Sequence, residues 1–242
     1  FPGAEPLCGD FDGDGIEEIA VYGETMGIWY LRTVDGRILG WGVPWGAPGL
    51  EPIVGDFDGD GADDLAVYDA GSGAWYIRKA LSDEIIAWKL QWGAPGLEPL
   101  TGDYDGDGID DLAVYHGESG LWYILSLDGR TLAWAEVWGG GVSYVPVPGD
   151  YDADGRHDLA LYDVSTGRWY IRSVAGPILV WGEQWGFAGA KPVPGDYNAD
   201  GRSDLAVYHQ PSGTWYIRTM NGTTLAWAHS WGWIAANPVP EP

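Results

Sequence analysis

The sequence is poor in the residues on which several classes of protein depend. It has one cysteine, Cys8, among 242 residues, which excludes an intrachain disulfide framework and any metal cluster held by thiolates. It has 12 lysines and arginines against 36 aspartates and glutamates, and this net charge of −24 opposes binding to nucleic acid or anionic lipid. No run of about 18 apolar residues is present, so the sequence predicts no membrane insertion.

Helical periodicity is also missing, and a fivefold internal repeat stands in its place. Gly-Asp pairs recur at spacings of 46 or 47 residues, beginning at Gly9, Gly55, Gly102, Gly149 and Gly195. Each pair opens a segment of the type GDFDGDGADDLAVY, which is followed by a Trp-Tyr pair and then by two further tryptophans. Fifteen of the 16 tryptophans occupy these three repeated positions, and Trp233 lies outside them.

Each repeat has the pattern of four short strands separated by turns. In the second repeat we expect these strands in EPIVGD (51–56), DLAVY (64–68), WYIR (75–78) and IIAWKLQW (85–92). Four strands in 46–47 residues, five times over, are typical of β-propeller blades. A β-solenoid usually has shorter rungs, and separate 46-residue domains would each have too small a core. We therefore predict an all-β, five-bladed β-propeller with four antiparallel strands per blade.

The repeats predict one propeller domain over residues 1–242 and a monomer. The blades are expected at about 1–46, 47–93, 94–139, 140–186 and 187–232. Residues 233–242 form either a tail or a ring-closing strand, because WGWIAANPVPEP aligns with WGFAGAKPVPGD. The final NPVPEP also resembles the start of a PEP-CTERM sorting signal of exported proteins.

The segment after each glycine follows the pattern D-x-[DN]-x-D-G-x-x-[DE]. Carboxylates at the first, third and fifth positions of a tight turn converge on one point, and the glycine lets the next carbonyl turn inward. The ninth position closes the shell with another carboxylate. Such an all-oxygen cage suits Ca²⁺, which takes 6–8 oxygen ligands at about 2.3–2.6 Å, whereas softer metals favour histidine or cysteine. We predict up to five Ca²⁺, one per blade.

The predicted ligands are the side chains at the first, third, fifth and ninth positions and the backbone carbonyl at the seventh. In the first loop they are Asp10, Asp12, Asp14, Ile16 and Glu18. In the second and third loops they are Asp56, Asp58, Asp60, Ala62 and Asp64, and Asp103, Asp105, Asp107, Ile109 and Asp111. In the fourth and fifth loops they are Asp150, Asp152, Asp154, Arg156 and Asp158, and Asp196, Asn198, Asp200, Arg202 and Asp204.

The last two loops are expected to bind more weakly than the first three. They replace the first glycine by Ala153 and Ala199, and the seventh position of each holds an arginine. The fifth loop also has Asn198 in place of a carboxylate. Fewer acids and an added cation lower the affinity for Ca²⁺. The alternative, a turn that binds nothing, is disfavoured because clustered ionised carboxylates repel one another unless a cation is present.

The segment WGAPGLEPIVGDFDGDGADDLAVYDAGSGAWYI (45–77) resembles an FG-GAP/VCBS repeat, the calcium-loop propeller repeat also found in integrin α-chain heads. The likeness covers all five repeats, with WG where that family often has FG. It implies a β-propeller with Ca²⁺ in the loops between first and second strands, in secreted or cell-surface proteins. The family includes adhesion heads, lectins and modules attached to enzymes, so it implies no single activity.

We expect an extracellular, calcium-stabilised module for binding, adhesion or structure, secreted or on the cell surface, whose partner is an unknown protein or glycan. A lectin is the first alternative, because aromatic faces beside hydrogen-bonding groups suit sugars. The rim opposite the metal loops would present Trp45, Trp92, Trp138, Trp185 and Trp231, near Asp69, His116, Asp163 and His209. In the competing interpretation these tryptophans are buried between blades.

A glycosidase is the second alternative, since five-bladed propellers host such enzymes. Glu5, Glu51 and Glu98 begin their first strands and could face the central channel. They are equivalent in the repeat, however, and equivalent environments do not give the divergent pKa values that acid and nucleophile require. A serine triad, a phosphate loop and a zinc motif are missing too. We therefore expect that the chain is not an enzyme and has no catalytic residues.

The charge can now be located. The five nine-residue loops hold 22 of the 36 acidic residues, and the rest of the chain has a net charge of only −4. Five bound Ca²⁺ would reduce the charge of the whole chain from −24 to −14. The acidity therefore predicts calcium and says little about the partner.

Overall fold

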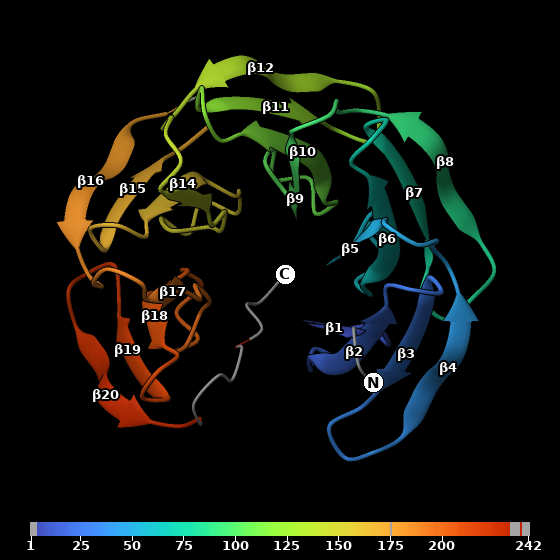
Figure 1. Ribbon diagram of the computed structural model, residues 1–242, viewed down its shortest axis with the longest axis horizontal. Coiled ribbons are helices and arrows are strands. Elements are labelled where there is room, and N and C mark those ends of the chain that lie inside the picture. The colour runs from blue at the N-terminus through green and yellow to red at the C-terminus, as the bar shows by residue number, and fades with distance from the viewer. Residues whose placement is uncertain (1–3, 175, 233–237, 239–242) are drawn as a thin grey trace.

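The predicted five-bladed β-propeller is confirmed. The structure is a computed structural model that describes residues 4–174, 176–232 and 238. Five antiparallel sheets, each of four strands consecutive in the sequence, surround a common centre (Figure 1). The first strand of each blade lies innermost, and β4, β8, β12, β16 and β20 form the outer edge. No helix that could span a membrane occurs within the described ranges.

The strands of the five blades follow the repeat. The first blade consists of β1 (Ala4–Gly9), β2 (Glu18–Gly23), β3 (Ile28–Arg32) and β4 (Ile38–Pro44). The second consists of β5 (Glu51–Gly55), β6 (Asp64–Asp69), β7 (Ala74–Lys79) and β8 (Ile85–Gln91). The third consists of β9 (Glu98–Gly102), β10 (Asp111–His116), β11 (Leu121–Leu125) and β12 (Thr131–Val137). The fourth and fifth consist of β13 (Tyr144–Pro146), β14 (Leu159–Asp163), β15 (Arg168–Arg172) and β16 (Ile178–Gln184), and of β17 (Lys191–Pro192), β18 (Leu205–His209), β19 (Thr214–Arg218) and β20 (Thr224–Ser230).

The core lies between the blades, where each sheet packs on the next. The second strands of the last four blades are buried on both faces, and β6 exposes none of the residues from Leu65 to Tyr68. An aromatic ring after the first strand of one blade packs with a leucine of the next, as Phe57 does with Leu112. Burying such apolar surface is the main force that holds the sheets together.

A tryptophan, buried in the first four blades and partly buried in the fifth, links the third strand of each blade to the segment that leaves it. Trp29, Trp75, Trp122 and Trp169 are fully buried. The indole Nε1 of Trp75 donates a hydrogen bond to the carbonyl oxygen of Trp92 at 2.7 Å, and the bond recurs in every blade. The first of the three repeated Trp positions therefore forms part of the core, as the packing interpretation predicts.

The glycine of each Trp-Gly pair is required by close packing. A Cβ on Gly93 would lie 2.3 Å from the hydroxyl oxygen of Tyr68, and its φ of 150° is disfavoured for other residues. The same clash would arise at Gly46 and Gly186. The glycine of the repeated WG is therefore explained by the tyrosine of the second strand in the same blade.

The first and fifth blades are not packed on one another as the other neighbours are. Ile19 is 47% exposed, whereas the equivalent Leu65 is fully buried. On the fifth blade Tyr197 is 43% and Trp231 is 70% exposed. The expected tail or ring-closing strand at 233–242, and the NPVPEP resemblance, lie outside the described residues apart from Pro238.

Candidate metal loops and inter-blade pockets

The aspartate-rich loops join the first and second strands of each blade. In the first four loops, oxygen atoms of three carboxylates lie within 4.8 Å of one another. The groups comprise the residues at the first, third and ninth loop positions: Asp10, Asp12 and Glu18; Asp56, Asp58 and Asp64; Asp103, Asp105 and Asp111; Asp150, Asp152 and Asp158. The sequence therefore identified three acids in each of these loops that the fold brings together.

The ninth carboxylate is buried beneath each loop. Asp64 and Asp111 are 2% and 1% exposed. One carboxylate oxygen of Asp64 accepts a hydrogen bond from the backbone N–H of Phe57 at 3.0 Å, and the bond recurs in all five loops. A buried acid thus faces the acids at the first and third positions.

Several oxygen atoms of these acids are buried without a hydrogen-bond donor. The Oδ1 atoms of Asp12, Asp58 and Asp105, all third-position residues, have no partner among the described residues. The Oδ1 atoms of Asp111 and Asp204, at the ninth position, have none either. Leaving such an oxygen buried and unpaired costs about 1–3 kcal/mol, and more when it is charged. A cation bound in the loop would satisfy these oxygens.

Burial and mutual repulsion raise the pKa values of the ninth-position acids. Burial raises the pKa of Asp64 to about 8, and the acids at the first, third and fifth positions of its loop repel its charge. The pKa values of Asp111 and Asp158 rise to about 7 for the same reasons. The protein alone does not stabilise these charges, whereas a divalent cation would. The donor set, all oxygen, fits Ca²⁺.

The fifth-position acids are engaged differently from the other three. Asp60 Oδ1 accepts a hydrogen bond from the backbone N–H of Ala62 at 3.0 Å, which shapes the turn. The equivalent bond forms in each of the other loops. These acids lie outside the close groups, so their role as ligands, like that of the seventh-position carbonyls, stays a prediction.

Basic side chains that the sequence did not reveal lie against the first three loops. Arg37 pairs with Asp12, and Arg130 Nη2 lies 2.7 Å from Asp105 Oδ2. Lys79 Nζ lies 2.5 Å from Asp58 Oδ2 and 2.7 Å from Asp60 Oδ2. They come from the ends of third strands and the turns that follow, about 20–25 residues after the loops. These basic groups offset part of the negative charge of the first three loops. They therefore act against the prediction that these loops bind Ca²⁺ more tightly than the last two.

The last two loops differ as the sequence indicates. Asn198 Nδ2 donates to Asp200 Oδ2 at 3.1 Å, so an amide takes the place of the third-position carboxylate. Arg156 and Arg202 make no ion pair within the described ranges. The weaker binding predicted for these loops therefore rests on the missing acid and on their backbone.

That backbone difference can be tested at Ala153. Its φ of 61° is a left-handed conformation that glycine adopts freely and alanine does not. We expect Ala153→Gly to raise the free energy of unfolding by about 1 kcal/mol, measured by urea denaturation. Ala62→Gly is the control, because Ala62 is not among the residues with positive φ and should be destabilised by glycine. Equal effects at both positions would contradict the account.

The stability of the metal-free chain should fall as the pH rises from about 4 to about 8. The folded-state pKa values of Asp64 and Asp111 lie above the ordinary value of 3.8, so folding favours their neutral forms. That stabilisation is complete at low pH and is lost as the pH passes the raised values. We expect the melting temperature in EDTA to decrease over this range, and Ca²⁺ to restore it most at high pH. A metal-free melting temperature that rises with pH would contradict the assignment.

The eighth loop position joins neighbouring blades. Asp63 Oδ2 accepts a hydrogen bond from the backbone N–H of Asp10 at 2.7 Å, while the N–H of Asp63 donates to the carbonyl oxygen of Asp10 at 2.7 Å. The backbone half of this arrangement recurs at the equivalent positions Asp110, His157 and Ser203. These bonds connect the first to the fifth loop in series along the rim that carries the metal loops, which we call the metal rim.

On the opposite rim the tryptophans separate into buried and exposed sets. Trp45 and Trp138 are buried between blades, Trp92 and Trp185 are partly buried, and Trp231 is exposed. The packing interpretation therefore holds for Trp45 and Trp138. Besides Trp231, the exposed rings are those of the fourth strands, which the sequence did not single out: Trp41, Trp88, Trp134, Trp181 and Trp227.

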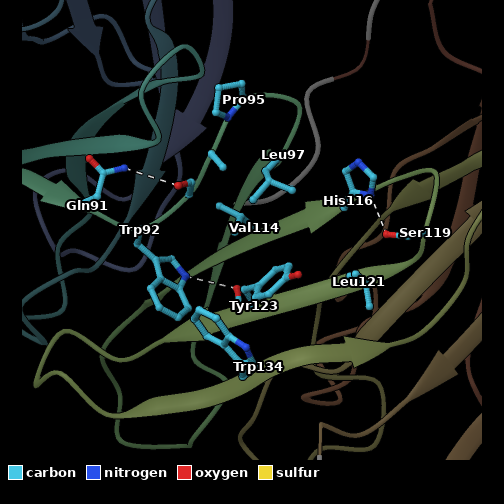
Figure 2. Close-up of a pocket in the computed structure, with 12 residues that line it drawn as sticks. Gln91, Trp92, Pro95, Leu97, Val114, His116, Ser119, Leu121, Tyr123 and Trp134 are labelled. Carbon is cyan, nitrogen blue, oxygen red and sulfur yellow. Dashed lines mark hydrogen bonds between the residues drawn. The ribbon is translucent and has the colours of Figure 1, made fainter.

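A pocket of about 680 Å³ opens between the second and third blades. Trp92, Tyr123 and Trp134 form one side of it, and His116 and Ser119 lie at its far end (Figure 2). His116 Nδ1 lies 2.6 Å from Ser119 Oγ, which orients the imidazole. A related pocket between the first and second blades is lined by Trp45, Tyr76, Trp88 and Ala47. Aromatic walls with a few polar groups suit a small organic ligand.

Comparison with known proteins agrees with the repeat. Residues 10–67 and 103–161 match the family described as FG-GAP-like repeat, as the sequence resemblance predicted. No curated protein sequence matches the chain.

Solved structures with the same propeller architecture include proteins of different kinds. One is a lectin of Agrocybe aegerita that recognises non-reducing terminal N-acetylglucosamine (TM-score 0.60, 15% identity, covering 91% of this chain and 64% of the lectin). A second is the calcium-binding protein regucalcin of Agrobacterium tumefaciens (TM-score 0.54, 11% identity, covering 91% and 72%). The chain thus spans somewhat less than two thirds of the lectin. At these identities the likeness shows the fold alone.

A third similar structure is virginiamycin B lyase of Staphylococcus aureus (TM-score 0.58, 12% identity, covering 92% of this chain and 69% of the lyase). It contradicts the prediction that the chain is not an enzyme, because it is an enzyme with this fold. That prediction assumed that repeat-equivalent side chains share one environment. The eighth loop position shows otherwise, since Asp63 accepts a hydrogen bond from the backbone of the neighbouring blade, whereas the equivalent His157, partly buried, packs against Gly102.

The three glutamates considered for catalysis lie on the inner strands. Burial raises the pKa of Glu98, and the charge of Glu51 adds to the effect. Burial also raises the pKa of Glu5, helped by Glu24 and Glu51. The fold therefore brings these carboxylates near one another, and all three pKa values move in the same direction.

Proposed function

We propose that this chain, a β-propeller of FG-GAP-like repeats, is an extracellular binding module that holds calcium in its loops. The supporting observation is the set of three converging carboxylates in each of four loops, with buried oxygens that lack a donor. Millimolar calcium outside cells would keep such loops loaded and stabilise the fold by mass action.

Bound Ca²⁺ ions would hold the five loops, and with them the blades, in fixed positions relative to one another. Each loop joins an innermost strand to the buried second strand, and the eighth-position hydrogen bonds connect it to the next blade. A rigid metal rim fixes the relative positions of the blades. The opposite rim, where the inter-blade pockets open, is then free to present a ligand-binding surface of fixed geometry.

Terbium luminescence tests the loops directly. Tb³⁺ replaces Ca²⁺ in oxygen cages and is excited by nearby tyrosine or tryptophan rings, and Tyr104 and Tyr151 lie within the third and fourth loops. We expect a strong signal that Ca²⁺ displaces and that Asp105→Asn, beside Tyr104, reduces by about the share of one tyrosine-containing loop. Glu118→Gln, in an exposed turn of the opposite rim, is the control and should change nothing. A signal insensitive to Asp105→Asn would oppose the proposal.

Carbohydrate binding is the second candidate, favoured by the pocket between the second and third blades. Its exposed Trp134 ring, partly buried Trp92 and Tyr123 rings and His116-Ser119 pair combine apolar faces with hydrogen-bonding groups. The Agrocybe aegerita lectin, which shares the fold, recognises N-acetylglucosamine. A pyranose offers the matching combination of apolar face and hydroxyl edge.

A glycan array with matched variants tests this candidate. We expect the chain to bind a subset of glycans and Trp134→Ala to reduce that binding at least tenfold. Trp227→Ala is the control, because Trp227 is equally exposed but lies at a junction that Phe187 fills. Binding that is lost equally in both variants, or that is absent in the parent chain, would exclude the candidate.

A further inference from the structure

We infer that all four described blade junctions are built as the same ligand pocket, and that the chain closes two of them with its own aromatic rings. Tyr144 closes the junction between the third and fourth blades, and Phe187 closes the one between the fourth and fifth. Two pockets then stay open, at the first-second and second-third junctions. The ligand named here rests on the proposed carbohydrate binding.

The walls of the four junctions are the same. In each, the exposed tryptophan of the fourth strand meets the tyrosine of the third strand edge-on, with ring centroids 5.2–5.4 Å apart. A tryptophan of the preceding blade lies 5.7–5.9 Å from that exposed ring. The shared set is Trp45, Tyr76 and Trp88; Trp92, Tyr123 and Trp134; Trp138, Tyr170 and Trp181; Trp185, Tyr216 and Trp227.

At the fourth-fifth junction a phenyl ring occupies the hollow. Phe187 follows the WG pair where the open pockets have Ala47 and Ala94. Its ring centroid lies 5.1 Å from His209 and 5.5 Å from Tyr216. The equivalent residues at the second-third junction, His116 and Tyr123, both line the open pocket (Figure 2). The hollow therefore has the size and walls to accept a six-membered ring.

At the junction between the third and fourth blades, the phenol ring of Tyr144 fills the hollow, although it comes from a different position in the junction segment. Tyr144 takes the place of Leu50 and Leu97, which line the two open pockets. Its ring centroid lies 5.7 Å from that of Tyr170, nearly edge-on at 80°. Two different substitutions thus fill two equivalent hollows, each against the tyrosine of the third strand.

The occupant of an open pocket is inferred from what fills the closed ones. Phe187 shows that a flat six-membered ring fits against the tyrosine and beside the polar end of the pocket. In the pocket between the second and third blades, the polar end consists of His116 and Ser119. At the equivalent place beside the pocket between the first and second blades, Ser72 Oγ donates a hydrogen bond to Asp69 Oδ2 at 2.5 Å. A pyranose has a ring of this size and places hydroxyl groups at its edge. The two pockets should therefore bind saccharides with different preferences.

Fluorine NMR with 5-fluorotryptophan distinguishes open from closed junctions, because each junction has one exposed reporter: Trp88, Trp134, Trp181 and Trp227. Single Trp→Phe variants assign the resonances. The probes are N-acetylglucosamine and cyclohexanol, a ring of similar size that needs no sugar-specific contacts. Among these four reporters, we expect both probes to shift only Trp88 and Trp134 in the parent chain.

Matched variants exchange the residues of open and closed junctions. Phe187→Ala should make Trp227 respond, and Tyr144→Leu should make Trp181 respond. Ala94→Phe should abolish the response of Trp134, and it keeps the test valid if an opened junction fails to fold. Cyclohexanol shifts that follow this pattern without any glycan binding would support the closed junctions and exclude the carbohydrate function. A response of Trp227 in the parent chain, or no change in the variants, would overturn the inference.

Discussion

Chelation of calcium is expected to lower the melting temperature of this chain by about 20 °C or more. At a concentration 100 times the dissociation constant, each bound ion adds about 2.7 kcal/mol to the free energy of unfolding. Four such sites contribute on the order of 10 kcal/mol, and a chain of this size changes by roughly 2–4 °C per kcal/mol. Calorimetry in EDTA and in millimolar Ca²⁺ measures the difference.

Single-loop variants show whether the effect belongs to the loops. Asp58→Ala should remove roughly a quarter of the calcium-dependent shift, since Asp58 Oδ1 is one of the buried oxygens without a donor. Asp200→Ala should remove less, because its loop already lacks one carboxylate. Equal losses would show that the ranking of the loops is wrong. A melting temperature unchanged by EDTA in the parent chain would contradict the calcium sites altogether.

The second large effect is expected from Trp122→Ala. Its side chain is fully buried, and its Nε1 donates a 3.1 Å hydrogen bond to the carbonyl oxygen of Trp138. Removing a buried tryptophan typically costs about 3–5 kcal/mol. We expect a loss of this size in the free energy of unfolding, or failure of the chain to fold, as measured by urea denaturation with calcium present.

Two other tryptophan variants make this result interpretable. Trp134→Ala removes a ring that is 70% exposed and should cost about 1 kcal/mol or less. Trp122→Phe keeps most of the buried volume but loses the Nε1 donor, and it should cost less than the alanine variant. If the buried and exposed tryptophans proved equally important, the division between core and rim described above would be wrong.

The fold and the metal loops could be predicted because they are local and repeated. The Gly-Asp loops and the Trp-Tyr pairs recur at 46–47 residues, which sets the number of blades. The loop pattern places its acids by chain geometry alone, and the structure brings the first, third and ninth of them together in four loops. Because each pattern occurs five times at the same spacing, a chance match is a poor explanation for it.

The remaining features depend on contacts between segments that are distant in sequence. Lys79, at the end of β7, pairs with acids of the loop that precedes β6, and Asp63 accepts a hydrogen bond from the preceding blade. Which tryptophans are exposed follows from how neighbouring sheets stack, and the sequence alone left open whether Trp45, which is buried, lies at the rim or between blades. The sequence could not predict that Phe187 fills the junction between the fourth and fifth blades. Its role follows from its contacts with Tyr216 and His209, which lie on other strands.

The most direct measurement is the number of metal ions per chain. Plasma mass spectrometry on protein equilibrated in Ca²⁺ and then passed through a desalting column counts the ions that remain bound. The account predicts at least three tightly held Ca²⁺, in the first three loops, with further weaker binding in the fourth and fifth loops at millimolar Ca²⁺. A chain that retains no calcium, and that shows no calcium binding by titration at neutral pH, would contradict it.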